Sequence, residues 1–167
     1  RELPDMDRLL AELGSLVPQH SDNTIVHGDY RFDNTIFDLV GMPRIEAVID
    51  WELSTLGDPL ADLGMALTYW HDLGDVEREL VPVALGVTAH EGFGTADEFA
   101  HRYANSTGRD LLLLPFYRAL GNMKLAVILE GVRARHAGGH TVSAGYEAVG
   151  DPVPALVAAG LKRLHTA

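Results

Sequence analysis

The residues that favour β-strands are confined to one short part of this chain, and this confinement restricts the possible folds more than any other feature. The β-rich runs are residues 25–26, 35–37 and 45–49. A glycine and a proline lie between the second and third runs, a pattern that predicts the turn of a hairpin over residues 38–44. We therefore predict a mainly α domain of the α+β class, with a small β-hairpin set into one face.

Helical periodicity accounts for most of the remaining chain. Apolar residues recur three and four positions apart, and start and stop signals bound the periodic segments. Asp58 and Pro59 have the types expected at an N-cap and a first helical position, and Thr95 with Glu98 has the spacing of a capping box. The predicted helices cover residues 5–17, a segment from 58 to about 70, residues 95–108, a segment from 115 to about 135, and residues 151–164.

Composition limits the functional classes. The chain has 167 residues, enough for one domain, which we take to be residues 1–167. The formal net charge of −11 argues against a nucleic-acid binder, which needs a basic surface, but not against a nucleotide bound through a metal ion. The absence of cysteine excludes disulfides and thiolate metal sites. No signal peptide or membrane-length apolar run is visible, so we expect a cytoplasmic enzyme without a membrane partner.

One short stretch carries most of the chemical information. Residues 27–34 read His-Gly-Asp-Tyr-Arg-Phe-Asp-Asn and have the H-x-D-x-x-x-x-N spacing of a kinase catalytic loop. Asp50 follows across the predicted hairpin. Phosphoryl transfer needs one carboxylate to orient a hydroxyl and accept its proton, and a second carboxylate with an amide oxygen to hold Mg²⁺. A strand before Asp29 and a hairpin between Asn34 and Asp50 would bring all three side chains to one end of the sheet.

The sequence HGDYRFDN, followed by VIDWELSTLGDPLADLG, resembles the aminoglycoside phosphotransferase and choline-kinase-like superfamily. It is most similar to the phosphotransferase domains found alongside acyl-CoA dehydrogenases. The resemblance implies the C-terminal lobe of a protein-kinase-like fold, in which the β-hairpin carries the catalytic and metal loops. It assigns Asp29 as the catalytic base, and Asn34 and Asp50 as ligands of Mg²⁺ that thereby bind ATP. Asp62 resembles the aspartate that accepts hydrogen bonds from the catalytic-loop backbone in this family.

The same resemblance implies a reaction. It is transfer of the γ-phosphate of ATP to a hydroxyl of a small molecule, with a hydroxyacyl thioester as one candidate acceptor. Two other functions stay open. One is a non-catalytic kinase-like binding module, against which the intact Asp29, Asn34 and Asp50 argue. The other is a metal-dependent hydrolase that uses Asp29, Asp50 and His27.

Several side chains near the motif have two interpretations. Arg31, two residues after Asp29, either stabilises charge on the transferring phosphoryl group or pairs with Asp33 or Glu52. His27 is interpreted as a structural residue that anchors the loop by hydrogen bonds rather than as a proton carrier. Glu52 is either a group close to the metal or an ordinary exposed acid.

Outside the motif, the interpretations are structural. Lys124, Arg133 and Arg135 on the long predicted helix could line a pocket for an acidic substrate, but a solvent-exposed face is the better interpretation for most of them. We predict that Trp51 and Trp70 lie in the core. The later histidines show no shared metal-ligand spacing.

Two parts of a complete family member have no counterpart in the sequence. There is no β-rich lobe with a phosphate-pairing lysine ahead of residue 5, and there is no Gly-rich nucleotide loop. We therefore expect a fragment that contains the catalytic lobe alone. Such a fragment would be inactive, and it would self-associate through the exposed face that normally meets the other lobe.

Overall fold

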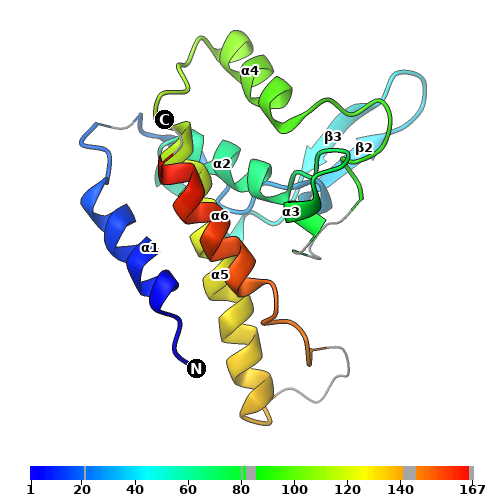
Figure 1. Cartoon of the computed structure of the whole chain (residues 1–167). Coiled ribbons are helices and arrows are strands. Elements are labelled where there is room, and N and C mark those ends of the chain that lie inside the picture. Colours follow the sequence, from blue (N-terminus) through cyan, green and yellow to red (C-terminus); the bar gives the residue numbers. More distant parts are fainter. Residues whose placement is uncertain (21, 80, 82–85, 141–145, 166–167) are drawn as a thin grey trace.

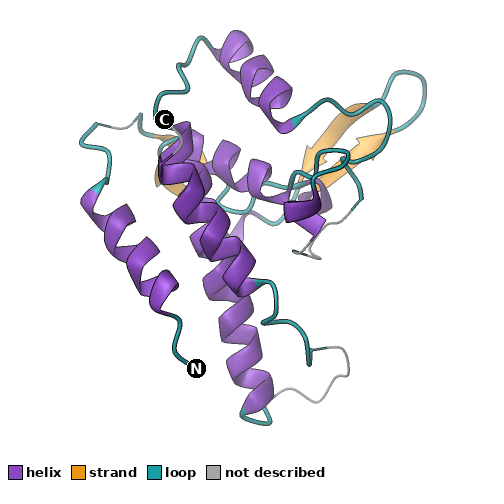
Figure 2. Ribbon diagram, viewed as in Figure 1, coloured by secondary structure: helices purple, strands orange, loops and turns teal. Residues whose placement is uncertain are grey.

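The structure is a computed structural model that describes residues 1–20, 22–79, 81, 86–140 and 146–165. Helices dominate it, and the strands form two small sheets (Figure 2). This arrangement confirms the predicted mainly α fold. The helices are α1 (Pro4–Ser15), α2 (Leu60–Tyr69), α3 (Val76–Glu79), α4 (Ala96–Thr107), α5 (Leu114–Ala137) and α6 (Val153–His165). The strands are β1 (Thr24–Val26), β2 (Thr35–Asp38), β3 (Arg44–Val48) and β4 (Thr55–Gly57), with 3₁₀ turns at Phe32–Asn34 and Trp51–Leu53.

The larger hydrophobic core lies among α1, α2, α5 and α6. Figure 1 shows α5 and α6 side by side, with α1 next to them. Leu9 of α1, Ala126 of α5 and Leu156 of α6 are almost completely shielded from solvent. Because α1 and α6 come from opposite ends of the sequence, this core joins the two ends of the described chain.

Two glycines form the contact between α2 and α5. A side chain at Gly64 of α2 would collide with the carbonyl oxygen of Tyr117. A Cβ atom at Gly121 of α5 would lie 2.5 Å from Thr68 Oγ1, which itself donates to Gly64 O at 2.9 Å. With only hydrogen atoms at both positions, the two helix backbones approach closely and pack without a gap.

A second core cluster joins α2 to α4 and to the start of α5. The predicted apolar stripe of α2 is buried in it, which confirms that part of the prediction. Trp70 is buried as predicted, but the prediction for Trp51 is wrong, because its side chain is 49% exposed. Trp51 Nε1 donates to Val48 O at 2.8 Å, so this ring covers the end of β3 from the solvent side. The cluster consists of Leu60, Leu63, Leu67, Trp70, Ala96, Ala100, Leu114 and Tyr117.

The capping box predicted for α4 is present, whereas α2 begins at Leu60 with Pro59, rather than Asp58, at the N-cap position. Asp58 Oδ1 accepts the N–H of Leu60 at 2.8 Å. Thr95 and Glu98 form both hydrogen bonds of a capping box, and Gly108 ends α4 with a φ of 71°. The short helix α3 was not predicted, and α1 ends slightly earlier than expected.

The two sheets are antiparallel pairs. In the predicted hairpin, Thr35 of β2 pairs with Val48 of β3, and the register shifts once between Ile36 and Phe37. The second pair joins β1 to β4, and β4 was not predicted from the sequence. Within the described residues, no helix is both long and apolar enough to cross a membrane.

Candidate active site

The loop that follows β1 is held by a carboxylate from α2. Asp62 Oδ2 accepts the N–H of His27 at 2.6 Å, and Asp62 Oδ1 accepts the N–H of Gly28 at 2.8 Å. The backbone hydrogen bonds expected of Asp62 are therefore present. Gly28 has a φ of 83°, and a Cβ atom there would lie 2.5 Å from the carbonyl oxygen of Leu53. Only glycine fits this turn, because both the backbone conformation and the available space exclude a side chain.

Both ring nitrogens of His27 are occupied by the backbone. Nδ1 accepts the N–H of Asp29 at 3.2 Å, so the ring proton lies on Nε2, which is 2.8 Å from Ile49 O. The ring is 2% exposed and lies 4.8 Å from the ring of Trp51. These contacts join the loop to the end of β3, and they leave no lone pair of the ring for a metal ion or a proton from a substrate.

Asp29 and Asn34 lie against each other. Asn34 Nδ2 donates to Asp29 O at 2.8 Å and is 3.2 Å from Asp29 Oδ2. Two acceptors around the same nitrogen fix the orientation of the amide, because its oxygen would be repelled there. No described residue donates a hydrogen bond to Asn34 Oδ1. The side chain thus orients Asp29 with one end and presents a carbonyl oxygen with the other.

Asp50 lies next to Asn34 across the hairpin and has an unusual backbone conformation. Asn34 O accepts the N–H of Ile49 at 2.9 Å, so Asp50 comes directly after the residue paired with Asn34. With φ 66° and ψ 55°, Asp50 is the only non-glycine among the described residues with a positive φ. Such a conformation costs free energy and is often retained where a side chain must be aimed at a ligand.

These two side chains fit a hard divalent cation. Asp50 is exposed and offers carboxylate oxygens, and Asn34 offers a neutral amide oxygen. Mg²⁺ binds such oxygens and takes its remaining ligands from water and phosphate. No cluster of three or more His, Cys, Asp or Glu side chains with metal-binding geometry occurs in the part of the chain that the structure describes. Asn34 and Asp50 therefore offer oxygen ligands of the kind that Mg²⁺ takes from proteins.

Arg31 is held between two acidic side chains and an aromatic ring. Its Nη1 is 3.1 Å from Asp33 Oδ2, its Nε is 3.4 Å from Asp29 Oδ2, and its guanidinium lies 5.1 Å from the ring centre of Tyr69. The contact with Asp29 is an ion pair without hydrogen-bond geometry, since Nε is buried and has no hydrogen-bond partner. Burial raises the pKa of Tyr69, and the negative charge of Asp29 adds to that shift. No contact joins Arg31 to Glu52 in the described structure.

The sequence analysis named Lys124 of α5 but did not connect it with the catalytic loop. Its half-buried Nζ donates to the carbonyl oxygen of Gly28. Lys124 is therefore an exception to the exposed face that we expected for most of these three residues. The signal in the sequence was a lysine in the middle of an apolar stretch of α5, between the buried Met123 and Leu125.

Arg133, by contrast, makes a surface ion pair. Its Nη2 is 2.6 Å from Glu130 Oε1, and the hydrogen bond from Arg133 is the main cause of the lowered pKa of Glu130. Arg135, near the end of α5, is exposed.

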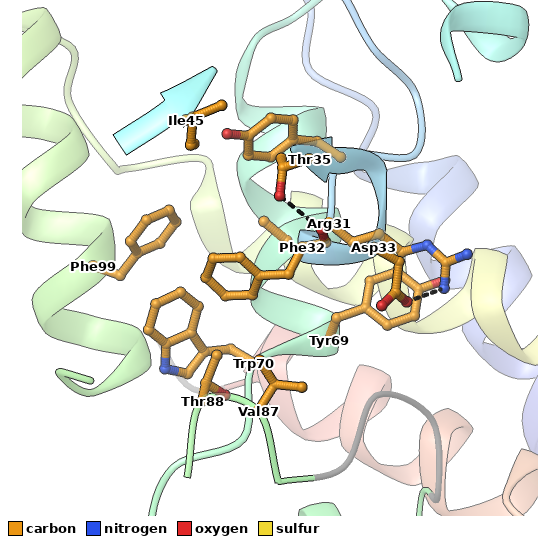
Figure 3. A pocket seen from close by; sticks show the side chains of 12 residues that line it. Arg31, Phe32, Asp33, Thr35, Ile45, Tyr69, Trp70, Val87, Thr88 and Phe99 are labelled. Atoms are coloured by element: carbon orange, nitrogen blue, oxygen red, sulfur yellow. Dashed lines mark hydrogen bonds and ion pairs between the residues drawn. The ribbon is translucent and has the colours of Figure 1, made fainter. Parts of the chain in front are cut away.

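A pocket of about 90 Å³ lies beside the catalytic loop. Phe32, Trp70 and Phe99 converge there from the loop, the end of α2 and α4, with Ile45 on one side and Val87 on the other (Figure 3). We call this site the aromatic pocket. Sequence analysis did not identify it, because its walls come from segments far apart in the chain.

Comparison with known proteins supplies the context for this geometry. Residues 1–110 match the phosphotransferase enzyme family. Acyl-CoA dehydrogenase family member 10 of Mus musculus is 34% identical over 153 residues, which are 85% of this chain and 13% of that protein. Viomycin phosphotransferase of Streptomyces vinaceus is 34% identical over 87 residues, which are 43% of this chain and 30% of that protein.

One solved structure matches nearly the whole chain. It is a Ralstonia eutropha protein that bears the name aminoglycoside phosphotransferase. The two folds superpose with a TM-score of 0.79 at 33% identity, over 98% of this chain and 49% of that one. The chain thus spans about half the length of the matched structure and a much smaller part of the mouse relative.

Proposed function

Because this chain belongs to the phosphotransferase enzyme family, we propose that it forms the catalytic lobe of an enzyme that transfers the γ-phosphate of ATP to a hydroxyl of a small molecule. The observation that carries the proposal is the hydrogen-bonded pair of Asp29 and Asn34, with Asp50 beside it in a strained conformation. This arrangement suits phosphoryl transfer, in which the protein mainly positions reactants and compensates charge.

Each residue has a defined task in this proposal. Asp29 orients the acceptor hydroxyl and takes its proton, while the amide of Asn34 fixes the direction of the Asp29 carboxylate. Asn34 Oδ1 and the Asp50 carboxylate would hold Mg²⁺. When bound, Mg·ATP supplies the phosphoryl group and part of the positive charge that its transfer requires. Arg31, close to Asp29, contributes further positive charge once an anionic group competes with Asp33 for its guanidinium.

His27, Asp62 and Lys124 keep the loop in place in this proposal. Asp62 accepts the backbone N–H of Gly28, and Lys124 donates to the carbonyl oxygen of the same residue. His27 connects the loop to the strand that precedes Asp50. A buried polar network in which most members have partners is rigid, and rigidity is what a positioning site needs.

The acceptor and the setting of the reaction are part of the proposal. The mouse relative is named an acyl-CoA dehydrogenase, which makes a hydroxyacyl thioester one candidate acceptor. We place the enzyme in the cytoplasm, and the net charge of −11 argues against nucleic acid as a partner. Since the chain spans 49% of the matched structure, we propose that a further lobe holds the α- and β-phosphates.

The two alternatives have less support. A hydrolase that uses His27 together with Asp29 and Asp50 would need a free ring nitrogen, and both nitrogens of His27 face backbone groups. A non-catalytic module would have no need of the strain at Asp50 or of the amide that orients Asp29.

The test is an Asp29→Asn substitution in the full-length protein. We expect turnover to fall by a factor on the order of 10²–10⁴, because asparagine keeps the shape but cannot accept the proton. ATP affinity, measured by titration calorimetry, should stay near wild type. By contrast, Asp50→Ala should weaken the binding of Mg·ATP itself. Asp7→Asn on the exposed face of α1 is the control, and turnover of Asp29→Asn equal to that control would remove Asp29 from the base role.

A further inference from the structure

One wall of the aromatic pocket is formed by aromatic and aliphatic side chains. The ring of Trp70 stacks on Phe99 at 4.6 Å, with an angle of 25° between the planes, and lies 5.9 Å from the ring of Phe32. Ile45 of β3 and Val87 complete the wall, and both side chains are partly exposed at the surface. A concave apolar site of this kind gains free energy when it encloses an apolar group, because both surfaces leave water.

Two hydroxyl groups and the guanidinium that line the pocket already have partners inside the protein. Thr35 Oγ1 donates to Phe32 O at 2.6 Å, and Thr88 Oγ1 bonds both the N–H and the C=O of His71. Arg31 is paired with Asp33. A sugar placed here would have to break these contacts before it could bond with those three groups, and that loss opposes its binding.

The pocket and the catalytic loop share residues. Phe32 and Arg31 both line the pocket, and Arg31 Nε is 3.4 Å from the Asp29 carboxylate. Figure 3 shows Arg31 and Asp33 at one end of the pocket and the rings of Phe32, Trp70 and Phe99 at the other. A molecule whose hydroxyl meets Asp29 therefore has this apolar wall as a neighbouring surface.

The size of the pocket limits the group that it can hold. Its volume is about 90 Å³, smaller than the apolar cavity of about 150 Å³ that accommodates benzene in another protein. The space suits a short alkyl segment of a few carbons rather than a ring system.

We propose that the aromatic pocket binds a short alkyl segment of the phosphate acceptor, so that the acceptor is a hydroxylated compound with an aliphatic chain next to its hydroxyl. This inference rests on the proposed function, because it takes Asp29 as the group that receives the hydroxyl. Ile45, Val87 and the three aromatic rings set the acceptor length in this proposal, and none of them takes part in the chemical step.

The first experiment measures acceptor use by the full-length protein with primary n-alkanols from ethanol to 1-octanol. Each methylene that enters the pocket should raise kcat/KM by about four-fold, the equivalent of about 0.8 kcal/mol, until the pocket is full. Ile45→Ala should move that limit to longer alkanols by about one or two carbons. Ile36→Ala is the matched control, since this exposed isoleucine lies on the same hairpin but does not line the pocket. Equal chain-length profiles for the two variants, or no dependence on chain length, would overturn the inference.

A second experiment separates this inference from the proposed function. Binding of 1-butanol to the full-length protein without nucleotide is followed by saturation-transfer NMR. Val87→Phe, which narrows the pocket from its exposed side, should abolish the signal, and Val76→Phe, at another exposed valine, should preserve it. Binding that Val87→Phe leaves intact contradicts the inference. If Val87→Phe removes the binding but the wild-type protein phosphorylates no alkanol, the pocket binds alkyl groups and the proposed function is wrong. The pocket is then not an acceptor site.

Discussion

The helices α1, α2, α5 and α6 form a helical bundle around the larger core, and apolar side chains such as Leu9 and Leu156 are shielded from solvent there. In the sheet of β1 and β4, by contrast, Ile25 and Leu56 remain 72% and 71% exposed. Ile25 and Leu56 are partners in the strand register, so their side chains lie on the same face of the sheet. The bundle therefore encloses a continuous hydrophobic core, whereas this strand face leaves two large apolar side chains in water. The catalytic loop lies in the strand region, yet the helices α2 and α5 hold it in place.

The largest expected effect concerns residues 1–167 on their own. They should show no measurable phosphotransferase activity, because we identify no group among the described residues that would hold the α- and β-phosphates. They should also self-associate through the exposed apolar residues of the strands, since large exposed apolar patches usually find a partner. Light scattering and a coupled ATP-consumption assay measure the two effects.

A double variant tests whether the exposed strand residues Ile25 and Leu56 cause the self-association. Ile25→Ser with Leu56→Ser should restore the monomer. Leu112→Ser, which removes an equally exposed leucine from the segment between α4 and α5, should not. An active, monomeric chain of residues 1–167 would contradict both parts of this prediction.

The next largest effect is a difference in stability between substitutions in the bundle and in the strand region. Leu156→Ala in α6 should lower the free energy of unfolding by about 2–5 kcal/mol, because it leaves a cavity in the larger core. Leu56→Ala in β4 should change it by less than about 0.5 kcal/mol, because the side chain is already in water. Urea unfolding of both variants measures the difference, and similar losses would show that the strand face is covered in solution.

Removal of the Asp62 carboxylate, which links the two regions, should have an intermediate effect on the free energy of unfolding. Asp62→Ala should cost about 1–3 kcal/mol, because the N–H groups of His27 and Gly28 lose their acceptor. The control is Asp7→Ala, which removes an exposed acid from the first turn of α1 and should cost only about 0.3–1 kcal/mol. If thermal unfolding gives equal midpoints for the two variants, Asp62 contributes only through the helix dipole.

The smallest expected effect is a pH dependence of the folding stability, caused by Tyr117 in the second core cluster. Burial, followed by the charge of Asp58 and a hydrogen bond with it, raises the pKa of Tyr117 from 10.0 to about 12. The folded state thus favours the neutral phenol, and its stability should fall as the pH rises from about 10 to about 12. Tyr117→Phe should make this decline shallower, whereas Tyr146→Phe should leave its slope unchanged. Urea midpoints at several alkaline pH values test the prediction.

Local signals in the sequence predicted the parts of the fold that depend on neighbouring residues. The capping box of Thr95 and Glu98 and the hydrogen bond from Leu60 to Asp58 each act over a few positions, and the hairpin turn does the same. The catalytic motif is likewise contiguous, so its chemistry could be inferred before its geometry was known. The functional roles of Asp29, Asn34 and Asp50 remain predictions.

Features that depend on long-range contacts could not be predicted. The strand β4 has only three residues, and it is a strand because β1 lies beside it. Trp51 looked like a core residue by type, but the turn after Asp50 directs it to the surface. Lys124 reaches Gly28 only because α5 passes under the loop, and the aromatic pocket exists only where several distant segments meet.

The glycine contact between α2 and α5 has a consequence for how the site moves. Gly28 is held from two directions, its N–H by Asp62 of α2 and its carbonyl oxygen by Lys124 of α5. Because Gly64 and Gly121 bring those helices into direct contact, neither helix can shift without the other. Opening of the loop is therefore tied to the opening of the bundle, and its amide hydrogens should exchange with solvent almost as slowly as those of the core. Under the proposed function, any closure over a bound nucleotide would therefore have to come from residues outside this loop.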